Sequence, residues 1–586
     1  MKGFFKYVMA GMLGTIIALI VVLLLSVITI IGVASSSSED IETEENSVLL
    51  LDFSETVADR TSSKPDFFDL KIKKQLGIRD LTTNIENAAK DDNIKGIYLE
   101  LSGIEGGIAT IEEVRNALLK FKESKKFIVA HADYYTHKSY YLASVADKVY
   151  LTPEGEIQFI GLSASITMYK SLLEKLGVEP EIIRHGKFKS AIEPFILDEI
   201  SEANREQTQK FMGSIWNTIV KGVSTQRNIS VEKLNEYADS LYLRSAKTAL
   251  EYKFVDGLLY KDQVYNEIRT LLSIKETEKI SFIEISKYNN AINKPKIDEL
   301  VSTSRNKIAV IYAVGEIGMG EGDDESIGSK NISEAIRKAR KDSSIKAIVL
   351  RVNSPGGSAL ASEIIWREAV LAQKEKPFIV SMGNVAASGG YYIACAADTI
   401  LAQPNTITGS IGVFGVLFNA KELMSKVGVN VSTVATNSFS DLGSTSRKIT
   451  AFERGIIQQG VEDVYTTFIT HVAQGRGMTV EEIDNIGQGR VWSGIDALEI
   501  GLVDVMGGLG DAIVIAAEKA GVEKYRIKTY PEKDKYQKMA EKLFAEAKVS
   551  FIKEELGSSY KYLERIKILS KQQGIQARIP YFIDIN

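Results

Sequence analysis

The sequence predicts an α/β protein that consists of two tandem homologous domains behind an N-terminal transmembrane helix. Three observations predict this architecture. Residues 94–178 repeat at 345–429 with a constant offset of 251 residues and no gaps. Within each copy, short β-rich runs alternate with helical patterns, which is typical of parallel βαβ units. A long uncharged segment near the N-terminus has the length of a membrane span.

The N-terminal segment predicts a membrane anchor at residues 7–33. Two lysines lie within residues 1–6, which we expect to be a cytoplasmic N-terminus, and five acidic residues lie within 34–47, which we expect to be a linker. The basic flank should stay in the cytoplasm, which places the body on the extracytoplasmic side. A cleaved signal peptide is the alternative, because small residues follow the apolar run. However, a run of 27 residues is longer than the core of a signal peptide.

The duplication sets the expected domain boundaries. We expect the first α/β repeat at 48–270 and the second at 306–525. Residues 271–305 are rich in Lys and Glu and predict a linker between the repeats. Residues 526–586 are charged with helical spacing and predict a helical tail that packs on the body, or else a helix for a partner or a membrane surface. The expected strands are 48–53, 97–101, 308–314 and 348–352, and the expected helices include 111–122 and 362–373.

Composition excludes several classes of function. The net charge is −5 with mixed signs, so we expect no basic face for nucleic acid. The single cysteine, Cys395, leaves no intrachain disulfide. The four histidines lack metal-ligand spacing and no phosphate-binding glycine loop with Lys-Ser or Lys-Thr is present, so we expect neither a metal nor a nucleotide cofactor.

Two reactive side chains show complementary loss between the copies. At the repeat offset, Ser410 falls opposite Phe159 and Lys189 falls opposite Ser440. The first copy therefore keeps a lysine without the serine, and the second keeps the serine without the lysine. This pattern predicts one Ser/Lys site assembled from both copies, with Ser410 as nucleophile and Lys189 as base. A lysine acts as a base only when it is neutral, which requires burial among apolar groups.

A glycine-rich turn predicts the oxyanion site. The turn at 353–358 follows a predicted strand directly, and Gly356 and Gly357 leave backbone N–H groups open to close approach. The backbone N–H of Ile411 is a further candidate donor. In the first copy the corresponding turn, 103–107, lacks the proline and one glycine, so we expect it to be catalytically idle. Ser388 is a rival nucleophile, although it also suits the N-cap of the helix that carries the paired tyrosines.

Four segments together resemble a known family. Residues 353–358, 385–392, 408–413 and 186–195 are similar to signal peptide peptidase A in its long, duplicated form, and the resemblance runs from about residue 48 to 508. It implies Clp protease/crotonase folds and a serine/lysine-dyad peptidase with Ser410 and Lys189 as the dyad. It also implies a homotetramer in the inner (cytoplasmic) membrane, with a periplasmic body that degrades cleaved signal peptides or short apolar peptides. Related Clp-type proteases resemble the Ser388 segment at their nucleophile.

Two other classes of function remain open at this stage. A crotonase-like enzyme would stabilise an acyl-thioester enolate at the same kind of turn, and binding of a CoA thioester would identify it. A catalytically silent scaffold for membrane proteins would not react with a serine-directed fluorophosphonate.

Overall fold

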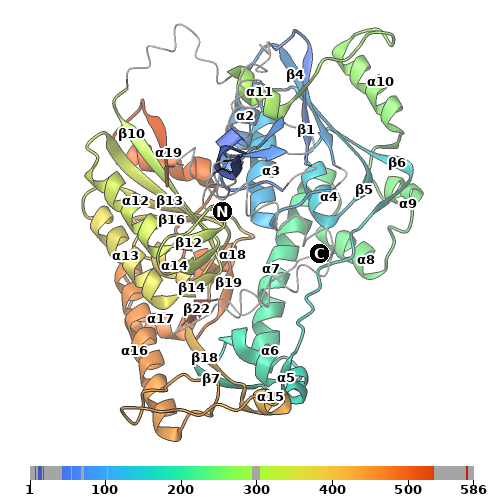
Figure 1. Ribbon diagram of the computed structural model, residues 1–586. Coiled ribbons are helices and arrows are strands. Elements are labelled where there is room, and N and C mark those ends of the chain that lie inside the picture. The colour runs from blue at the N-terminus through green and yellow to red at the C-terminus, as the bar shows by residue number, and fades with distance from the viewer. Residues whose placement is uncertain are drawn as a thin grey trace.

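The computed structural model describes residues 7, 11–15, 17–18, 43–53, 56–66, 71–101, 103–292, 304–532 and 576–578. Two sheet-containing halves lie beside one another, and an arm to which both contribute points away from them at the bottom of Figure 1. The halves follow the order of the chain, the first in blue and green and the second in yellow to red.

The first half is built on a six-stranded sheet in which every pairing is parallel. Its apolar strands are buried on both faces, which explains why they read as continuous hydrophobic runs. In spatial order the strands are β8 (Gly257–Leu258), β6 (Lys148–Ile157), β5 (Phe127–Tyr135), β4 (Ile94–Glu100), β1 (Ser47–Asp52) and β9 (Phe282–Glu284).

The second half repeats this order in an eight-stranded sheet. The corresponding path is β20 (Val505–Met506), β16 (Thr399–Ala402), β15 (Phe378–Ala387), β13 (Ile345–Ser354), β10 (Lys307–Val314) and β21 (Arg526–Tyr530). β17 (Ile407–Gly409) and β19 (Val491–Ser493) branch from β15. The structure thus has the predicted tandem α/β duplication.

Two predicted boundaries are wrong. The expected linker at 271–305 contains β9, which pairs with β1, and the expected tail at 526–586 begins with β21, which pairs with β10. β9 and β21 are edge strands, and they occupy equivalent positions in their two sheets. They are short and carry charged residues, as edge strands often do, so they do not show the apolar pattern of the inner strands.

Helices cover the faces of both sheets. On α12, residues Ile332, Ala335, Ile336 and Ala339 are buried with the spacing of one helical face. The helices of the first half are α2 (Ile78–Lys90), α3 (Ile108–Lys122), α4 (His137–Ala143), α7 (Glu202–Arg227), α8 (Val231–Asp239), α9 (Ala246–Glu251), α10 (Lys261–Leu272) and α11 (Ile285–Ile292). Those of the second half are α12 (Ser329–Lys341), α13 (Ala359–Gln373), α14 (Gly389–Ala394), α17 (Val480–Ile486), α18 (Gly494–Glu499) and α19 (Leu509–Lys519).

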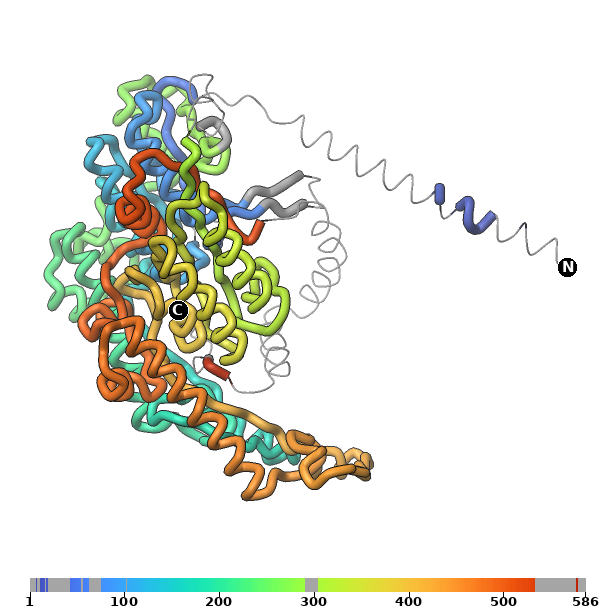
Figure 2. The backbone as a smooth tube through the Cα atoms, turned by 90° about the vertical axis from the view of Figure 1, so that its left-hand side faces the viewer, coloured from blue at the N-terminus to red at the C-terminus, as the bar shows by residue number. Residues whose placement is uncertain are grey.

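The arm consists of two strands and the helices around them. β7 (Glu179–His185) comes from the first half and β18 (Val413–Asn419) from the second. The helical segments are α5 (Lys170–Leu176), the 3₁₀ turn η1 (Ser190–Ile192), α6 (Glu193–Ile196), α15 (Lys421–Lys426) and α16 (Ala451–Arg476). Figure 2 shows the end of this arm, around α15, projecting away from the sheets.

A third sheet joins remote parts of the chain. Its spatial order is β12 (Ser326–Gly328), β11 (Glu316–Gly318), β14 (Gly356–Ser358), β22 (Gln576–Arg578), β18 and β7. The predicted glycine turn, the C-terminal segment and the arm therefore meet in one sheet. A separate hairpin pairs β2 (Ser62–Asp66) with β3 (Lys71–Gln75).

The two halves share buried structure. Arg351 on β13 is fully buried, and its guanidinium contacts Glu113 of α3 at 2.7 Å and Asp59 at 2.8 Å. The amide side chain of Asn384 exchanges hydrogen bonds with Thr110 at the start of α3. Apolar residues of both halves also form one continuous core cluster. The halves thus form one folded body.

The predicted anchor at 7–33 lies mostly outside the described residues, which include only 7, 11–15 and 17–18 of it. None of the helices in the described part of the chain combines the length and apolarity needed to cross a bilayer. The helical pattern predicted near the C-terminus, from 533 to 575, also falls outside the described residues. The described residues 576–578 are a strand, not a helix.

Candidate active site

The arm brings the lysine of the first half to the second half. β7 pairs antiparallel with β18 along its whole length, from Glu179 opposite Asn419 to His185 opposite Val413. Because Val413 follows Ser410 closely in the chain, this register carries the segment after His185 to the Ser410 loop. Lys189 lies there, just beyond the end of β7.

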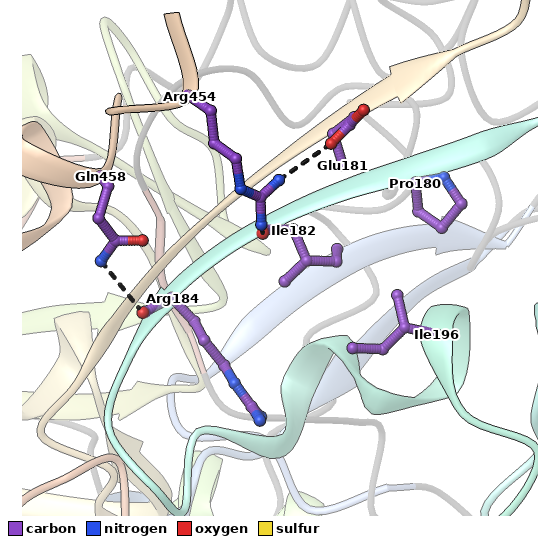
Figure 3. A pocket seen from close by; sticks show the side chains of 7 residues that line it. All are labelled: Pro180, Glu181, Ile182, Arg184, Ile196, Arg454 and Gln458. Atoms are coloured by element: carbon purple, nitrogen blue, oxygen red, sulfur yellow. Dashed lines mark hydrogen bonds and ion pairs between the residues drawn. The ribbon is translucent and has the colours of Figure 1, made fainter. Parts of the chain in front are cut away.

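α16 of the second half holds β7 in this register. Figure 3 shows Arg454 of α16 reaching both the Glu181 carboxylate, at 3.0 Å, and the backbone carbonyl of Ile182, at 2.7 Å. Gln458, one turn further along α16, donates to the carbonyl of Arg184 at 3.4 Å. These contacts fix the strand that delivers Lys189.

The loop at 487–490 packs against both Lys189 and the Ser410 segment. Gly489 donates its N–H to the carbonyl of Ile411 at 2.7 Å, and Ser410 donates its own N–H to the carbonyl of Arg490 at 2.6 Å. A Cβ added to Gly489 would lie 2.6 Å from the backbone nitrogen of Lys189, and its φ is +80°. Only glycine fits between these backbones. The Gly-Gln-Gly spacing at 487–489 was the available sequence signal, and the sequence analysis missed it.

Lys189 is the centre of the site. Its Nζ lies 2.8 Å from Oγ of Ser388, 3.1 Å from Oγ of Ser410 and 3.0 Å from the carbonyl oxygen of Ser410. All three residues are 0 % exposed. The structure thus brings together the predicted base, the predicted nucleophile and the rival nucleophile around one amine.

The lysine is in the state that a general base needs. Its hydrogen-bond partners are neutral oxygens, and complete burial lowers the pKa of the Lys189 amine well below its usual value. The neutral form has a lone pair that can accept a proton from a hydroxyl.

Ser388 occupies a strained turn between a strand and a helix. It lies between β15 and α14, with φ 56° and ψ −116°, a conformation that L-residues rarely adopt. It begins the helix as predicted, but its side chain makes no capping hydrogen bond, so the capping interpretation is wrong. A sharp strand-to-helix turn of this kind presents a serine Oγ and places the next backbone N–H beside it.

Ser410 lies in a loop between two strands, β17 and β18. The φ of Ser410 is also positive, at 49°, and the preceding residue, Gly409, has a φ of 75°. Its hydroxyl donates to the carbonyl of Gly489 at 3.3 Å. The Ser410 proton is thereby directed to a backbone carbonyl, while its oxygen accepts from Lys189.

The glycine turn at 353–358 lies beside the Ser388 turn. Gly356 has φ +99°, and a Cβ on it would lie 2.8 Å from the backbone nitrogen of Gly389, the residue after Ser388. The N–H of Gly356 donates to Oγ of Ser354 at 3.1 Å, and Gly357 lies opposite Ile317 of β11. The amide of Gly389, which the sequence analysis did not select, thus lies at the predicted oxyanion turn. Ile411, whose N–H was the further predicted oxyanion donor, is buried, and its carbonyl accepts the hydrogen bond from the N–H of Gly489.

In the first half, aromatic side chains occupy the positions that correspond to the two serines of the site. Phe159, the counterpart of Ser410, packs at 5.0 Å from Trp216 and 6.4 Å from His137, the counterpart of Ser388. Burial lowers the pKa of His137 to about 4. Ser440, the counterpart of Lys189, is exposed in the second half. Each half alone therefore lacks part of the constellation.

The turn at 103–107, which is the first-half counterpart of the glycine turn, has a different role. A Cβ on Gly107 would lie 2.1 Å from the side chain of Asn384, so this turn packs against the second half. It supports the interface between the halves.

Comparison with known proteins places the chain among peptidases. The family model "Peptidase family S49" matches residues 120–275 and 371–523, one region in each half. Over 502 residues the chain is 37% identical to "Protease 4" of Salmonella typhi, covering 83% of this chain and 80% of the relative. It is 33% identical over 452 residues to "Serine protease SPPA, chloroplastic" of Arabidopsis thaliana, covering 76% and 66%. A solved ClpP1 mutant from Listeria monocytogenes matches at 15% identity with a TM-score of 0.24, covering 37% of this chain and 99% of that one.

Proposed function

This chain belongs to peptidase family S49 and is a serine peptidase, and we propose that it degrades cleaved signal peptides with Ser388 as nucleophile and Lys189 as general base. The observation that carries the proposal is the 2.8 Å contact between Nζ of Lys189 and Oγ of Ser388 in a fully buried site. The crotonase-like and scaffold alternatives have no comparable support.

Three features favour Ser388 over Ser410 as the nucleophile. Ser388 is nearer to Nζ, and it has the strained strand-to-helix turn. The amide of Gly389 follows it directly and lies at the glycine turn. The hydroxyl of Ser410 already donates to a backbone carbonyl, so Ser410 suits a role in orienting the Lys189 amine.

The reaction follows from these positions. Neutral Lys189 takes the proton of Ser388 as Oγ attacks the carbonyl carbon of the peptide. The N–H of Gly389 and the turn at Gly356 lie where negative charge develops on the carbonyl oxygen. The ammonium of Lys189 then protonates the leaving amine, and an acyl-enzyme remains on Ser388. Water releases the acyl group with Lys189 again as base.

The substrate class rests on the resemblance to signal peptide peptidase A and on the SPPA name of one relative. A cleaved signal peptide is short and apolar, which suits a site whose three central residues are buried. As part of the same proposal, residues 7–33 anchor the enzyme in the inner membrane, with the N-terminus cytoplasmic and the body on the periplasmic side. Both halves would have the Clp protease/crotonase type of fold.

We also propose that the enzyme works as a homotetramer. The end of the arm exposes a group of large apolar side chains, and Val434 is 98 % exposed. Apolar groups gathered at one end of an extended arm favour contact with a second copy. The other members are Val427, Val429, Val431, Phe439, Leu442, Phe452 and Ile456.

Variants of the two central residues test the catalytic proposal. With a leucine-rich peptide as substrate, Ser388→Ala and Lys189→Ala should abolish cleavage, and Ser388→Ala should also abolish labelling by a fluorophosphonate. Lys187→Ala is the matched control, because Lys187 is exposed two residues away and should be dispensable. If Ser388→Ala keeps both activities and Ser410→Ala loses them, the nucleophile is Ser410. A folded wild-type enzyme that neither cleaves nor reacts would overturn the proposal.

A further inference from the structure

A buried glutamine of the first half lies against the segment that carries Lys189. Gln207 is on α7 and is 0 % exposed. Its Nε2 donates to the carbonyl of Phe188 at 3.1 Å and to Oγ of Ser190 at 2.7 Å. Its Oε1 accepts the N–H of Val491, on β19, at 3.1 Å. One amide group thus contacts the residues on both sides of Lys189 and also a strand of the second half.

Lys189 is the central residue of a tight turn. Its φ of −76° and ψ of 76° are close to those of an inverse γ-turn, and the N–H of Ser190 donates to the carbonyl of Phe188 at 2.8 Å. Such a turn closes with one short-range hydrogen bond, so its geometry depends on what holds its two ends. Gln207 contacts both ends, Phe188 through its carbonyl and Ser190 through its hydroxyl. The glutamine therefore fixes the backbone from which the Lys189 side chain extends to Ser388.

The contacts determine which way the amide of Gln207 faces. A backbone N–H can only donate and a carbonyl can only accept, so Oε1 must face Val491 and Nε2 must face Phe188. Asn204, about one turn earlier on α7, supports this orientation, because its Oδ1 accepts from Nε2 of Gln207 at 3.3 Å. Nδ2 of Asn204 in turn donates to the buried carboxylate of Glu193 at 3.0 Å. Buried groups thus hold the amide in one orientation.

The strand that Gln207 contacts also holds the Ser410 loop. Val491 follows Arg490, whose carbonyl accepts the N–H of Ser410 at 2.6 Å. Val491 itself pairs with Gly409, the residue before Ser410, in the ladder of β17 and β19. Gln207 therefore joins the turn that carries the base to the backbone that positions the serine hydroxyl.

Two charged side chains flank the turn, and neither reaches Nζ of Lys189 in the described contacts. The guanidinium of Arg184 donates to the carbonyl of Lys189 at 3.5 Å. The guanidinium of Arg490 lies 4.6 Å from the ring centre of Phe188 and forms an ion pair with Glu206 at 2.9 Å. Burial is the cause of the lowered pKa of Lys189. That pKa therefore depends on how completely water is kept from the amine.

We propose that Gln207 is a positioning residue of the peptidase, which holds the Lys189 turn against β19 so that the amine stays shielded from water and within reach of Ser388. This inference rests on the proposed function and deepens it. In the described contacts Gln207 touches neither Ser388 nor Ser410, so it acts through Lys189. Without the amide, the turn should loosen and admit water to Nζ, and the pKa of Lys189 should move back toward the usual lysine value. The enzyme would then need a higher pH to keep its base neutral.

The test is the pH profile of kcat/KM for the full-length enzyme in detergent, with a leucine-rich peptide as substrate. Gln207→Met keeps a side chain of similar length and removes the hydrogen bonds of the amide. The midpoint of its acidic limb should lie about one pH unit or more above that of wild type. Below both midpoints such a shift lowers kcat/KM about 10-fold, and the deficit should shrink as pH rises.

Asn84→Leu is the matched control. Asn84 is likewise a buried amide of the first half, and on α2 its Nδ2 donates to Oδ1 of Asn289 at 3.2 Å. The substitution removes a buried amide of similar environment that is not part of the Lys189 turn. It should lower stability and leave the midpoint of the acidic limb unchanged.

Ser190→Ala supplies a milder variant in case Gln207→Met folds poorly. It removes the 2.7 Å contact between Ser190 and Gln207 with little change in volume. The acidic limb should move in the same direction as in Gln207→Met by a smaller amount. The double variant should shift it by less than the sum of the two separate shifts, because both changes loosen the same turn.

The outcomes separate this inference from the proposed function. If wild type is active and the folded variants of Gln207 and Ser190 keep its acidic limb, or move it to lower pH, Gln207 has only a structural role and the inference is wrong. An equal upward shift in Asn84→Leu also overturns it. If folded wild type does not cleave the peptide, the proposed function itself is wrong.

Discussion

Lys189 and Ser388 come from opposite halves of an internal duplication, and the Nζ of one lies 2.8 Å from the Oγ of the other in a site closed to solvent. The arm strands β7 and β18 make this contact, since their pairing carries Lys189 across the boundary between the halves. One half has kept the base and the other has kept both hydroxyls. The duplication thus yields a single composite site.

Ser410→Ala should lower activity without abolishing it. The hydroxyl of Ser410 contacts Nζ at 3.1 Å, but the backbone carbonyl of the same residue also contacts it and survives the substitution. We expect kcat to fall about 10- to 100-fold, which corresponds to the loss of one hydrogen bond to the base. Steady-state kinetics beside Ser388→Ala measure this. An undetectable kcat for Ser410→Ala with a normal kcat for Ser388→Ala would reverse the two roles.

The pH profile of kcat/KM should report the buried amine. Protonated Lys189 cannot accept the proton of Ser388, so activity should fall as pH decreases through the lowered pKa of Lys189. The acidic limb of the profile should therefore have its midpoint well below the usual pKa of a lysine, which is about 10.4. A limb at the usual lysine pKa would contradict a neutral base at physiological pH.

The same pKa shift should make stability depend on pH. Between the lowered folded pKa and the unfolded pKa, the unfolded chain holds a proton on Lys189 that the folded chain does not hold. The free energy of unfolding should therefore rise with pH across this window. Lys189→Met lacks this contribution, so the difference between wild type and Lys189→Met should change in favour of wild type as pH rises. Denaturant unfolding of both chains at several pH values measures it, and a difference that is constant with pH would contradict it.

Gly489→Ala should displace the lysine. The added Cβ would lie 2.6 Å from the backbone nitrogen of Lys189, and the φ of +80° adds strain. Since small displacements in catalytic geometry can cost about 100-fold, we expect a loss of that order in kcat. Gly477→Ala is the matched control, because φ there is +66° and nothing lies within 4 Å of the added Cβ. Equal losses in the two variants would assign the effect to backbone strain alone.

Arg351→Met should destabilise the contact between the halves. The substitution leaves Asp59 and Glu113 buried without their cation, and burial already raises the pKa of Glu113. We expect the free energy of unfolding to fall by about 3–5 kcal/mol. Arg337→Met is the control, because Arg337 is partly exposed and its ion pair with Glu368 should contribute less than about 1 kcal/mol. Similar losses in both variants would contradict a special role for the buried cation.

The sequence predicts the parts of this fold that repeat. Inner strands such as β4 and β13 contain short apolar runs, 97–99 and 347–350, and the constant offset between the copies matches the two strands to each other. The convergence of Lys189 and Ser410 follows from the same comparison, because each is missing from the other copy. These signals are local in the sequence or preserved by duplication.

The remaining features depend on pairing between remote segments. β22 is three residues long, and its place between β14 and β18 follows from backbone geometry that composition does not encode. The strain at Ser388 is likewise invisible in Ala-Ser-Gly-Gly, which also suits an ordinary helix start. For this reason the sequence analysis ranked Ser410 first, while the geometry favours Ser388.

Gly356→Ala should remove the peptidase activity proposed for the site. An added Cβ would lie 2.1 Å from the carbonyl oxygen of Ala577 and 2.8 Å from the nitrogen of Gly389, so no peptide carbonyl could take that position. The loss of one oxyanion contact typically lowers kcat by about 10²–10³-fold, and we expect at least that here. The rate of cleavage of a leucine-rich peptide measures this loss. Gly443→Ala is the control, with φ +87° and nothing within 4 Å of the added Cβ. If Gly356→Ala cleaves the peptide as fast as Gly443→Ala does, the substrate carbonyl does not bind at this turn.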